Sequence, residues 1–271
     1  MSISTLQKRN KLNHLLRNWL AGTVALQSWL EKHAISRQLS DVYVKSGWIQ
    51  KIGQGAFIKA GDKVDWMGGL YALQQQLGLK VHLGGKSLLE IIGASHFVPL
   101  GSQKTLELYA DADTQKKALP KWFVEGFKAS VEIRYWPRGF FKNPIGLDSF
   151  AHPNFSIQVS TKERALMEVL ALVPERVSYS HAYLLFQGQE TLRSTLVQGL
   201  LEACTSYKIK RLFLHLGTKC GLPWVTRLNL EKIDLGQGKR QIGNGGSYDK
   251  NYKISVPRLD TFEDNNEDIE V

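Results

Sequence analysis

The sequence predicts a mixed α+β fold in two parts, a small N-terminal unit of helices closed by a hairpin and a larger mixed α/β unit. Three observations support this prediction. Apolar residues recur at helical spacing in three short segments before residue 47. The segment 45–61, KSGWIQKIGQGAFIKAG, then reads as two short strands around glycines. Beyond residue 95, strand-like runs give way to four helical patterns.

The N-terminal elements follow from periodicity and capping. Residues 10–22 predict a first helix with a leucine and tryptophan face that ends at Gly22, and Thr23 is expected to cap a second helix over 24–34. Ser36 is a good N-cap for a third helix over 36–46. The side chains of this third helix that we expect to point inward are Ile35, Leu39, Val42 and Tyr43.

Three helices followed by a basic hairpin form the layout of a winged helix-turn-helix, in which the third helix enters the major groove. Apolar side chains anchor the hairpin, and glycines permit its tight tip. The packing side chains are expected to be Trp48, Ile49, Ile52 and Phe57. The residues expected to contact DNA are Ser36, Arg37, Gln38, Ser40 and Lys45 of the helix and Lys51, Gln54 and Lys59 of the wing. The alternative is a structural hairpin that closes a small domain with a solvated basic face.

The composition changes near Ser95, which sets the expected domains at 1–95 and 96–258, with an acidic tail at 259–271. Residues 62–78 and 86–93 predict helices, with a strand over 79–85 between them. Further strands are expected at 96–101, 105–110, 130–137 and 155–160, and helices at 116–127, 161–174, 178–188, 192–207 and 209–221. A late hairpin over 238–257 is expected to close the fold, and the tail, which has almost nothing to bury, to be disordered.

Charge favours a polyanionic partner. The 271 residues carry a net charge of +10, and the last twelve contain six acids and no base, so the remainder is near +16. Two further basic sets could add anion contacts. Lys208, Lys210 and Arg211 lie at a helix start, where solvated lysines are the commoner explanation. Lys239, Arg240, Lys250 and Lys253 lie on the late hairpin and could extend a DNA-facing surface or meet an acidic partner.

Nothing in the sequence demands an enzyme. The segment LGGKS at 83–87 lacks the earlier glycine of a phosphate-binding loop, because position 80 is Lys80. The seven histidines are scattered, so we expect no metal and no cofactor, although His82 and His96 could approach each other. Cys204 and Cys220 are expected to be reduced thiols, and the absence of a long apolar run predicts a cytoplasmic protein with no membrane partner.

Several stretches, taken in order, resemble one known family. They are YVKSGWIQKIGQGAF at 43–57, the segment 61–101, the segment 161–188, LLEACTSYKIKRLFLHL at 200–216 and LGQGKRQIGNGGSYDKNYKISVP at 235–257. Together they are similar to the AbiEi family, the antitoxin half of type IV abortive-infection toxin–antitoxin systems. The acidic tail after Arg258 matches no feature of that family.

The resemblance implies a winged helix-turn-helix domain joined to a C-terminal antitoxin domain. It also implies two activities. Such proteins repress their own operon by binding inverted repeats in its promoter, and they counter a nucleotidyltransferase-type toxin, usually without a stable toxin complex. The alternative is a protein-interaction module that neutralises the toxin through direct contact by its C-terminal domain.

Overall fold

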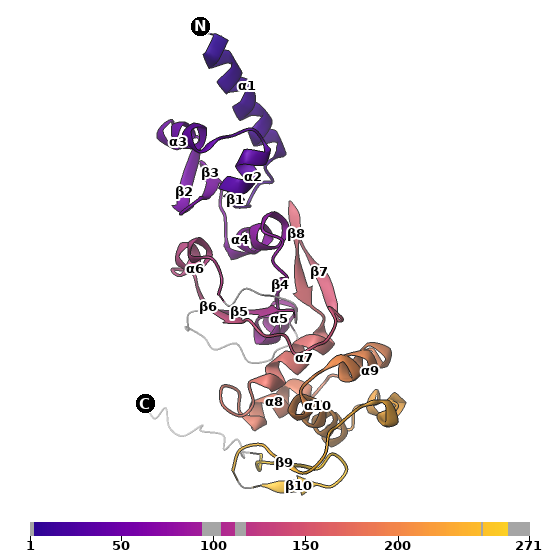
Figure 1. The fold of residues 1–271 in the computed structure, drawn as a ribbon. Helices are drawn as coiled ribbons and strands as arrows, with labels where there is room; N and C mark the ends of the chain where they lie inside the picture. The colour runs from indigo at the N-terminus through magenta and orange to yellow at the C-terminus, as the bar shows by residue number, and fades with distance from the viewer. Residues whose placement is uncertain (1–2, 94–103, 112–117, 245, 260–271) are drawn as a thin grey trace, which may run out of the picture.

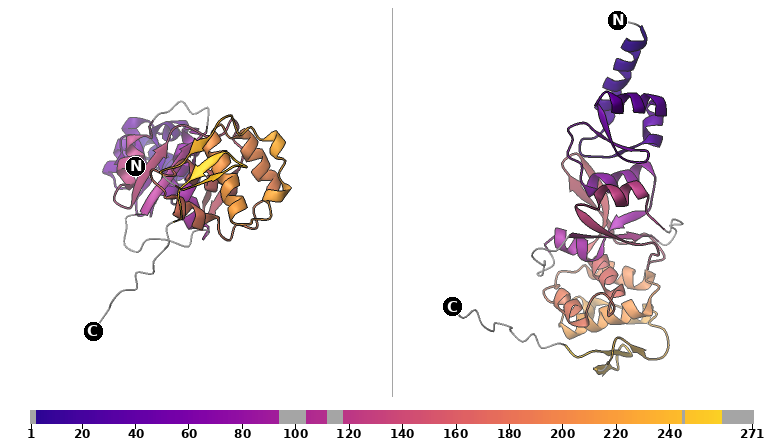
Figure 2. Two further views of the ribbon diagram at one scale, coloured as in Figure 1. Left: turned by 90° about the horizontal axis from the view of Figure 1, so that it is seen from below. Right: turned by 90° about the vertical axis from the view of Figure 1, so that its left-hand side faces the viewer.

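The molecule is elongated, with three groups of elements arranged along one axis (Figure 1). The computed structural model describes residues 3–93, 104–111, 118–244 and 246–259. The N-terminal helices and a small sheet lie at one end, a five-stranded sheet lies in the middle, and a group of helices and a second small sheet form the other end (Figures 1 and 2). The strand expected at 96–101, His96 and residues 260–271 of the acidic tail lie outside the described residues.

The N-terminal unit combines three helices with a three-stranded antiparallel sheet of order β1-β3-β2. Its elements are α1 (Ile3–Asn18), β1 (Ala25–Leu26), α2 (Gln27–Lys32), α3 (Arg37–Lys45), β2 (Ile49–Gly53) and β3 (Ala56–Lys59). The helix expected over 24–34 therefore begins three residues later, at Gln27, and ends at Lys32. Ala25 pairs with Phe57 and Leu26 with Ala56, so pairing with a distant strand determines the conformation of this segment.

This unit has a hydrophobic core of its own, built from α1, the second and third helices and the hairpin. The inward orientation expected for Ile35 and Tyr43 is confirmed, because both are buried. Val42 and Trp48 were expected to pack inward, and both predictions are wrong: their exposed fractions are 41% and 51%. The buried members of this core are Leu12, Leu15, Trp19, Ala25, Leu30, Ile35, Tyr43, Ile49 and Phe57.

A connecting segment joins the two sheets. It contains α4 (Trp66–Tyr71), the π-helical turn η1 (Ala72–Gln76), β4 (Val81–Leu83) and α5 (Gly85–Ile91). Asp65 caps α4 by accepting from the backbone N–H of Met67 at 2.8 Å. Gln76 holds this segment to β1, because its side chain accepts from the N–H of Leu26 at 2.8 Å and donates to the carbonyl of Val24 at 2.7 Å.

The central sheet has five strands in the order β6-β5-β4-β8-β7. The further strands are β5 (Lys104–Ala110), β6 (Val131–Trp136), β7 (Leu147–His152) and β8 (Phe155–Ser160), of which β7 was not expected from the sequence. β4 pairs antiparallel with β5 and parallel with β8. The middle strand of this sheet thus comes from before residue 95, and the domain boundary at 95/96 stays a prediction.

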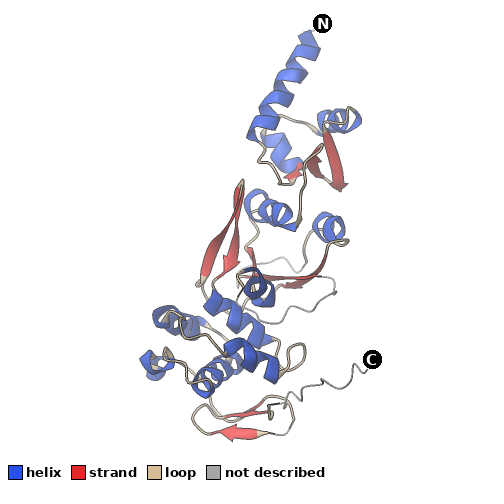
Figure 3. Cartoon of the chain, turned by 180° about the vertical axis from the view of Figure 1, so that it is seen from behind, coloured by secondary structure: helices blue, strands red, loops and turns tan. Residues whose placement is uncertain are grey.

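Helices cover the sheet and form the far end of the molecule (Figure 3). They are α6 (Lys121–Phe127), α7 (Lys162–Ala171), α8 (Tyr179–Phe186), α9 (Ser194–Ala203) and α10 (Tyr207–Lys219), with short 3₁₀ turns η2 (Val225–Arg227) and η3 (Leu230–Lys232). Hydroxyl N-caps at Thr161, Ser178 and Ser206 begin α7, α8 and α10. The chain then forms β9 (Arg240–Gln241), β10 (Ser247–Asp249) and β11 (Ile254–Val256), a small sheet in which β11 is the middle strand.

Candidate nucleic-acid interface

The third helix is fixed at its N-terminus and along one face. The Ser36 hydroxyl accepts from the backbone N–H of Leu39, as expected of the N-cap. Ile35 and Tyr43 are buried against the first two helices, and burial raises the pKa of Tyr43. The helix is therefore held firmly while its opposite face stays open.

The open face of α3 is mostly polar. Arg37, Gln38, Asp41 and Lys45 are all exposed. Arg37 is exposed over 84% of its side chain and lies 3.7 Å from Glu31, so this ion pair contributes little and leaves the guanidinium accessible. Arg and Gln side chains on such a face can reach the edges of guanine and adenine in a major groove.

Ser40 does not lie on this face. Its exposed fraction is 1%, and its hydroxyl lies 2.8 Å from the carbonyl of Arg37 and 2.9 Å from the side-chain oxygen of Gln27. The expectation that Ser40 contacts DNA is therefore wrong, because its hydroxyl is used inside the protein. Exposed Val42 lies two residues further along the helix, on the opposite face, and the sequence pattern assigned the two positions in reverse.

The hairpin β2–β3 forms the candidate wing. Lys51 and Gln54 are exposed near its tip, and Gly55 takes a positive φ of 69° there. The carbonyl of Gly55 accepts from the N–H of Gln27 at 2.8 Å, which ties the tip to the start of α2. Lys59 is half-buried, and its ammonium group donates to the carbonyl of Leu16 at 3.4 Å, which leaves two of its three N–H groups for other partners.

The wing is also packed on the second half of the chain. A Cβ placed on Gly53 would lie 2.7 Å from Cβ of Trp122 in α6, so only a glycine permits this approach. A Cβ placed on Gly126 of the same helix would lie 3.6 Å from the carbonyl oxygen of Ile52, an ordinary contact distance. The wing therefore has one face held by α6, and this contact links the N-terminal unit to the central sheet (Figure 1).

The cations expected at the start of α10 are structural. Lys210 donates to the carbonyl of Asp234 at 2.8 Å, and Lys208 donates to the carbonyls of Ala171 and Val173 at 2.9 and 2.7 Å. Burial lowers the pKa of Lys208. These contacts satisfy the carbonyl groups of two loops, so the expectation that Lys208 and Lys210 meet an external anion is wrong.

Arg211 donates more hydrogen bonds than the other two cations at the start of α10. Its side chain has no exposed surface, and its guanidinium donates to carbonyl groups from two segments of the C-terminal region. The acceptors are the carbonyls of Leu235, Gly236, Gln237, Gly238 and Lys253. The expected anion contact of Arg211 is therefore also wrong. Lys239 and Arg240 are exposed, and Lys239 lies over the ring of Tyr248 at 5.1 Å.

The segment LGGKS begins α5, and its backbone amides are occupied from within the protein. The N–H of Gly85 donates to Glu168 at 3.0 Å and the N–H of Lys86 donates to Glu107 at 2.7 Å. A Cβ on Gly84 or Gly85 would clash with these same carboxylates. Two buried glutamates thus occupy the positions that a phosphate would take in a nucleotide-binding loop.

Glu168 belongs to a buried charged network beneath this segment. Its carboxylate pairs with Arg164 and with His82, both at 2.9 Å, and accepts from the Ser160 hydroxyl at 2.7 Å. Burial raises the pKa of Glu168, but the charges of His82 and Arg164 and these hydrogen bonds outweigh it, so the pKa is lowered. Arg164 also pairs with Asp111 at 2.9 Å. The network holds α7 against β4 and β5.

The described residues contain neither a metal site nor a membrane-spanning helix. Across residues 3–93, 104–111, 118–244 and 246–259, no group of three or more His, Cys, Asp or Glu side chains could hold a metal ion. In the same part of the chain, no helix has the length and apolar character needed to cross a bilayer. Cys204 and Cys220 are both free thiols, and burial raises the pKa of each.

Two family models and a solved structure match this chain. Residues 8–100 match the family model described as "Transcriptional regulator, AbiEi antitoxin N-terminal domain", and residues 103–257 match "Transcriptional regulator, AbiEi antitoxin, Type IV TA system". The crystal structure of the RV2827C protein from Mycobacterium tuberculosis covers 93% of this chain and 92% of its own, with a TM-score of 0.58 and 11% identity, a similarity of fold alone. No curated protein matches the sequence.

Proposed function

This chain belongs to the AbiEi family of transcriptional regulators, the antitoxins of type IV toxin–antitoxin systems, and we propose that it represses its own operon by binding inverted repeats in the promoter. In this proposal α3 enters the major groove with Arg37 and Gln38 toward the bases. Lys45, Lys51 and Gln54 contact the phosphate backbone, and the Ser36 end of the helix lies close to it. Lys59, at the end of β3, contacts the phosphate backbone with its remaining N–H groups, whereas Ser40 takes no part because its hydroxyl is bonded inside the protein.

One observation carries the proposal: α3 is anchored by a buried face and an N-cap, while its opposite face and the adjacent wing tip expose Arg, Gln and Lys side chains. A rigid helix with free polar side chains is what direct readout of bases requires. The net positive charge of residues 1–259 also supports DNA as the partner, because each phosphate that a cation neutralises releases counterions and so favours binding.

The antitoxin activity is proposed to oppose a nucleotidyltransferase-type toxin encoded beside this chain. We assign that activity to the second half, whose helices and small sheet lie at the opposite end from α3 (Figure 1). Co-expression tests it. Growth arrest by the toxin should be relieved by the full chain and equally by an Arg37→Ala variant, whose change is confined to the DNA-binding end.

A promoter-binding assay tests the repressor activity. Fluorescence anisotropy should show tighter binding to a duplex carrying the promoter's inverted repeats than to a duplex of scrambled sequence and equal length. Binding that is equal for the two duplexes would leave only non-specific attraction and would contradict the proposed repression. A reporter fused to the promoter should be repressed by the wild-type chain and released by Arg37→Ala.

A second candidate is direct contact between the C-terminal half and the toxin. The exposed cations Lys239, Arg240 and Lys250 favour it, because they lie on the small sheet at the end of the molecule farthest from α3 (Figure 1). A stable complex with the toxin on size-exclusion chromatography, lost on charge reversal of Lys239 and Arg240, would support direct contact. Neutralisation without any complex would support indirect antagonism.

A further inference from the structure

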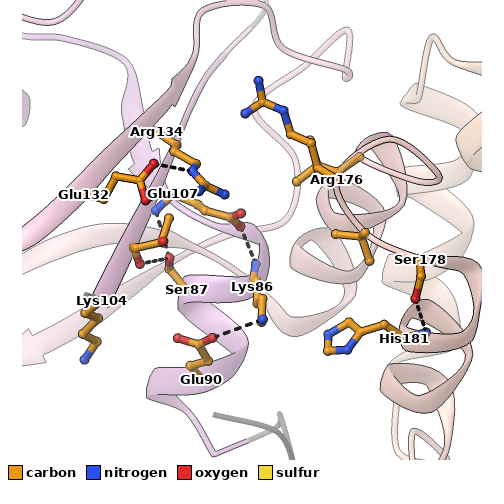
Figure 4. A pocket seen from close by; sticks show the side chains of 13 residues that line it. Lys86, Ser87, Glu90, Lys104, Glu107, Glu132, Arg134, Arg176, Ser178 and His181 are labelled. Atoms are coloured by element: carbon orange, nitrogen blue, oxygen red, sulfur yellow. Dashed lines mark hydrogen bonds and ion pairs between the residues drawn. The ribbon is translucent and has the colours of Figure 1, made fainter. Parts of the chain in front are cut away.

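A cavity of about 820 Å³ lies between the central sheet and the helices of the second half. Its volume is in the range of small-molecule sites, which is about 300–1,000 Å³. One wall is formed by α5 and the neighbouring strands β5 and β6, and the other by the segment between α7 and α8 and the first turn of α8 (Figure 4). The cavity is far from the exposed face of α3 along the chain and in the fold (Figure 1).

The lining of this cavity is rich in charge. Basic side chains come from each wall: Lys86 from α5, Lys104 from β5, Arg134 from β6 and Arg176 from the segment before α8. Three glutamates, Glu90, Glu107 and Glu132, line it as well. Five separate elements therefore contribute groups that can form hydrogen bonds, and the character of the site depends on which of these groups are already paired.

All three glutamates have partners within the protein. Glu132 is held by Arg134 through two hydrogen bonds of 3.0 and 3.1 Å. Glu107 accepts from the backbone N–H of Lys86 at 2.7 Å, and burial raises the pKa of this carboxyl group. Glu90 lies 3.9 Å from the ammonium group of Lys86. Each of the three carboxyl groups therefore already has a partner within the protein.

Two cationic side chains and one imidazole nitrogen of the lining lack such partners. Neither Lys104 nor Arg176 forms an ion pair with any residue in the described part of the chain, and the Arg176 guanidinium lies 5.9 Å from the centre of the Trp136 ring. The His181 ring points toward Lys86, and its Nε2 atom is buried with no hydrogen-bond partner among the described residues (Figure 4). A buried polar atom without a partner is costly unless a ligand or water satisfies it.

We propose that this cavity binds a small phosphorylated metabolite, with its phosphate group held by Arg176 and the rest of the molecule contacted by Lys104 and His181. A phosphate monoester has a charge near −2 and three acceptor oxygens, which match several separated donors better than a single carboxylate does. The volume exceeds what a phosphate ion fills, so the remainder of the ligand is organic and polar. A cationic ligand fits less well, because the glutamates are already engaged.

Titration of the full-length protein with three probes tests the proposal. The probes are inorganic phosphate, ribose 5-phosphate and succinate, each at ionic strength matched with sodium chloride and followed by thermal shift and isothermal titration calorimetry. Both phosphates should raise the melting temperature above the chloride control, and ribose 5-phosphate should bind more tightly than phosphate. Succinate should give a weaker effect than either.

Variants locate the site. Arg176→Ala should weaken binding of ribose 5-phosphate by about tenfold or more, because it removes a charge-assisted hydrogen-bond donor. Arg227→Ala is the matched control, since Arg227 is exposed and outside the cavity. Lys51→Ala, at the wing, should also leave binding unchanged and thereby exclude the DNA-binding end. Circular dichroism and the melting temperature without ligand report whether Arg176→Ala is folded, and His181→Ala supplies a second variant.

Several results would overturn the proposal. They are no phosphate-specific stabilisation, equal stabilisation by succinate, or undiminished binding in folded Arg176→Ala and His181→Ala. Stabilisation by inorganic phosphate alone would reassign the cavity to the free ion. None of these results bears on promoter binding, which is measured separately at α3 and the wing.

Discussion

The backbone of Gly53 in the wing strand β2 lies directly against the side chain of Trp122 in α6, so that a Cβ at position 53 would be 2.7 Å from Cβ of Trp122. This contact fixes the wing relative to the central sheet, because α6 leads into its edge strand β6. The wing is therefore a hairpin with one face held inside the protein, and only its tip and outer side are open to DNA.

Gly53→Ala should destabilise the protein by about 1–3 kcal/mol, because the added methyl group overpacks the contact with Cβ and Cα of Trp122. The matched control is Gly126→Ala in the same contact, where the new Cβ would lie 3.6 Å from the carbonyl of Ile52. That change should be neutral or slightly stabilising, since alanine favours a helix over glycine. Urea denaturation of both variants measures the difference, and equal stability would show that the wing is not packed on α6 in this way.

Arg211→Lys should cost about 3 kcal/mol of stability, because lysine cannot reach all the carbonyls that the buried guanidinium satisfies. Arg240→Lys, at an exposed position nearby, should change stability by less than about 0.5 kcal/mol. Thermal and urea denaturation provide the measurement. A small effect at Arg211 would mean that the loop carbonyls are satisfied in some other way.

The ion pair between Glu163 and Arg193 should make stability depend on pH. Burial raises the pKa of Glu163, but hydrogen bonds from the side chain and backbone of Arg193 outweigh it, so the pKa is lowered. A carboxyl group with a lowered folded-state pKa stabilises the protein above its unfolded pKa of about 4.3, and this contribution is lost as pH falls through the folded value.

Glu163→Gln should therefore be less stable than the wild type by about 1–2 kcal/mol near pH 7, a modest value because the Arg193 side chain is largely exposed. The difference in stability between Glu163→Gln and the wild type should narrow as the pH drops below about 4. Glu231→Gln, at an exposed position, serves as the control. Urea denaturation at several pH values measures this difference in stability. A difference that stays constant with pH would rule out the ionised pair of Glu163 and Arg193 as its cause.

Local patterns in the sequence predicted what depends on local chemistry. The Ser36 cap and the helices of the second half depend on residues within one or two turns, and the structure has them. The family and the α+β class also followed from the sequence. Periodicity was less exact at single positions, and it exchanged the environments of Ser40 and Val42.

What the sequence did not reveal depends on distant partners. β1 forms because Ala25 and Leu26 pair with a strand thirty residues later, and Arg211 is buried because loop carbonyls from residues 235–238 and 253 converge on it. The cavity groups, Lys86, Lys104, Arg134, Arg176 and His181, come from elements that only the tertiary fold brings together. No spacing along the chain marks such a set.

The salt dependence of promoter binding tests the central claim most directly, with the wild type, Lys51→Ala, Arg37→Ala and the control Arg227→Ala compared by fluorescence anisotropy. We predict that affinity falls steeply with salt for the wild type and that Lys51→Ala lowers the slope of log K against log salt by about 1. Arg37→Ala should weaken binding to the promoter more than to a scrambled duplex, and Arg227→Ala should match the wild type. Affinity that barely changes with salt, or that is unchanged in both Lys51→Ala and Arg37→Ala, would contradict DNA binding through α3 and the wing.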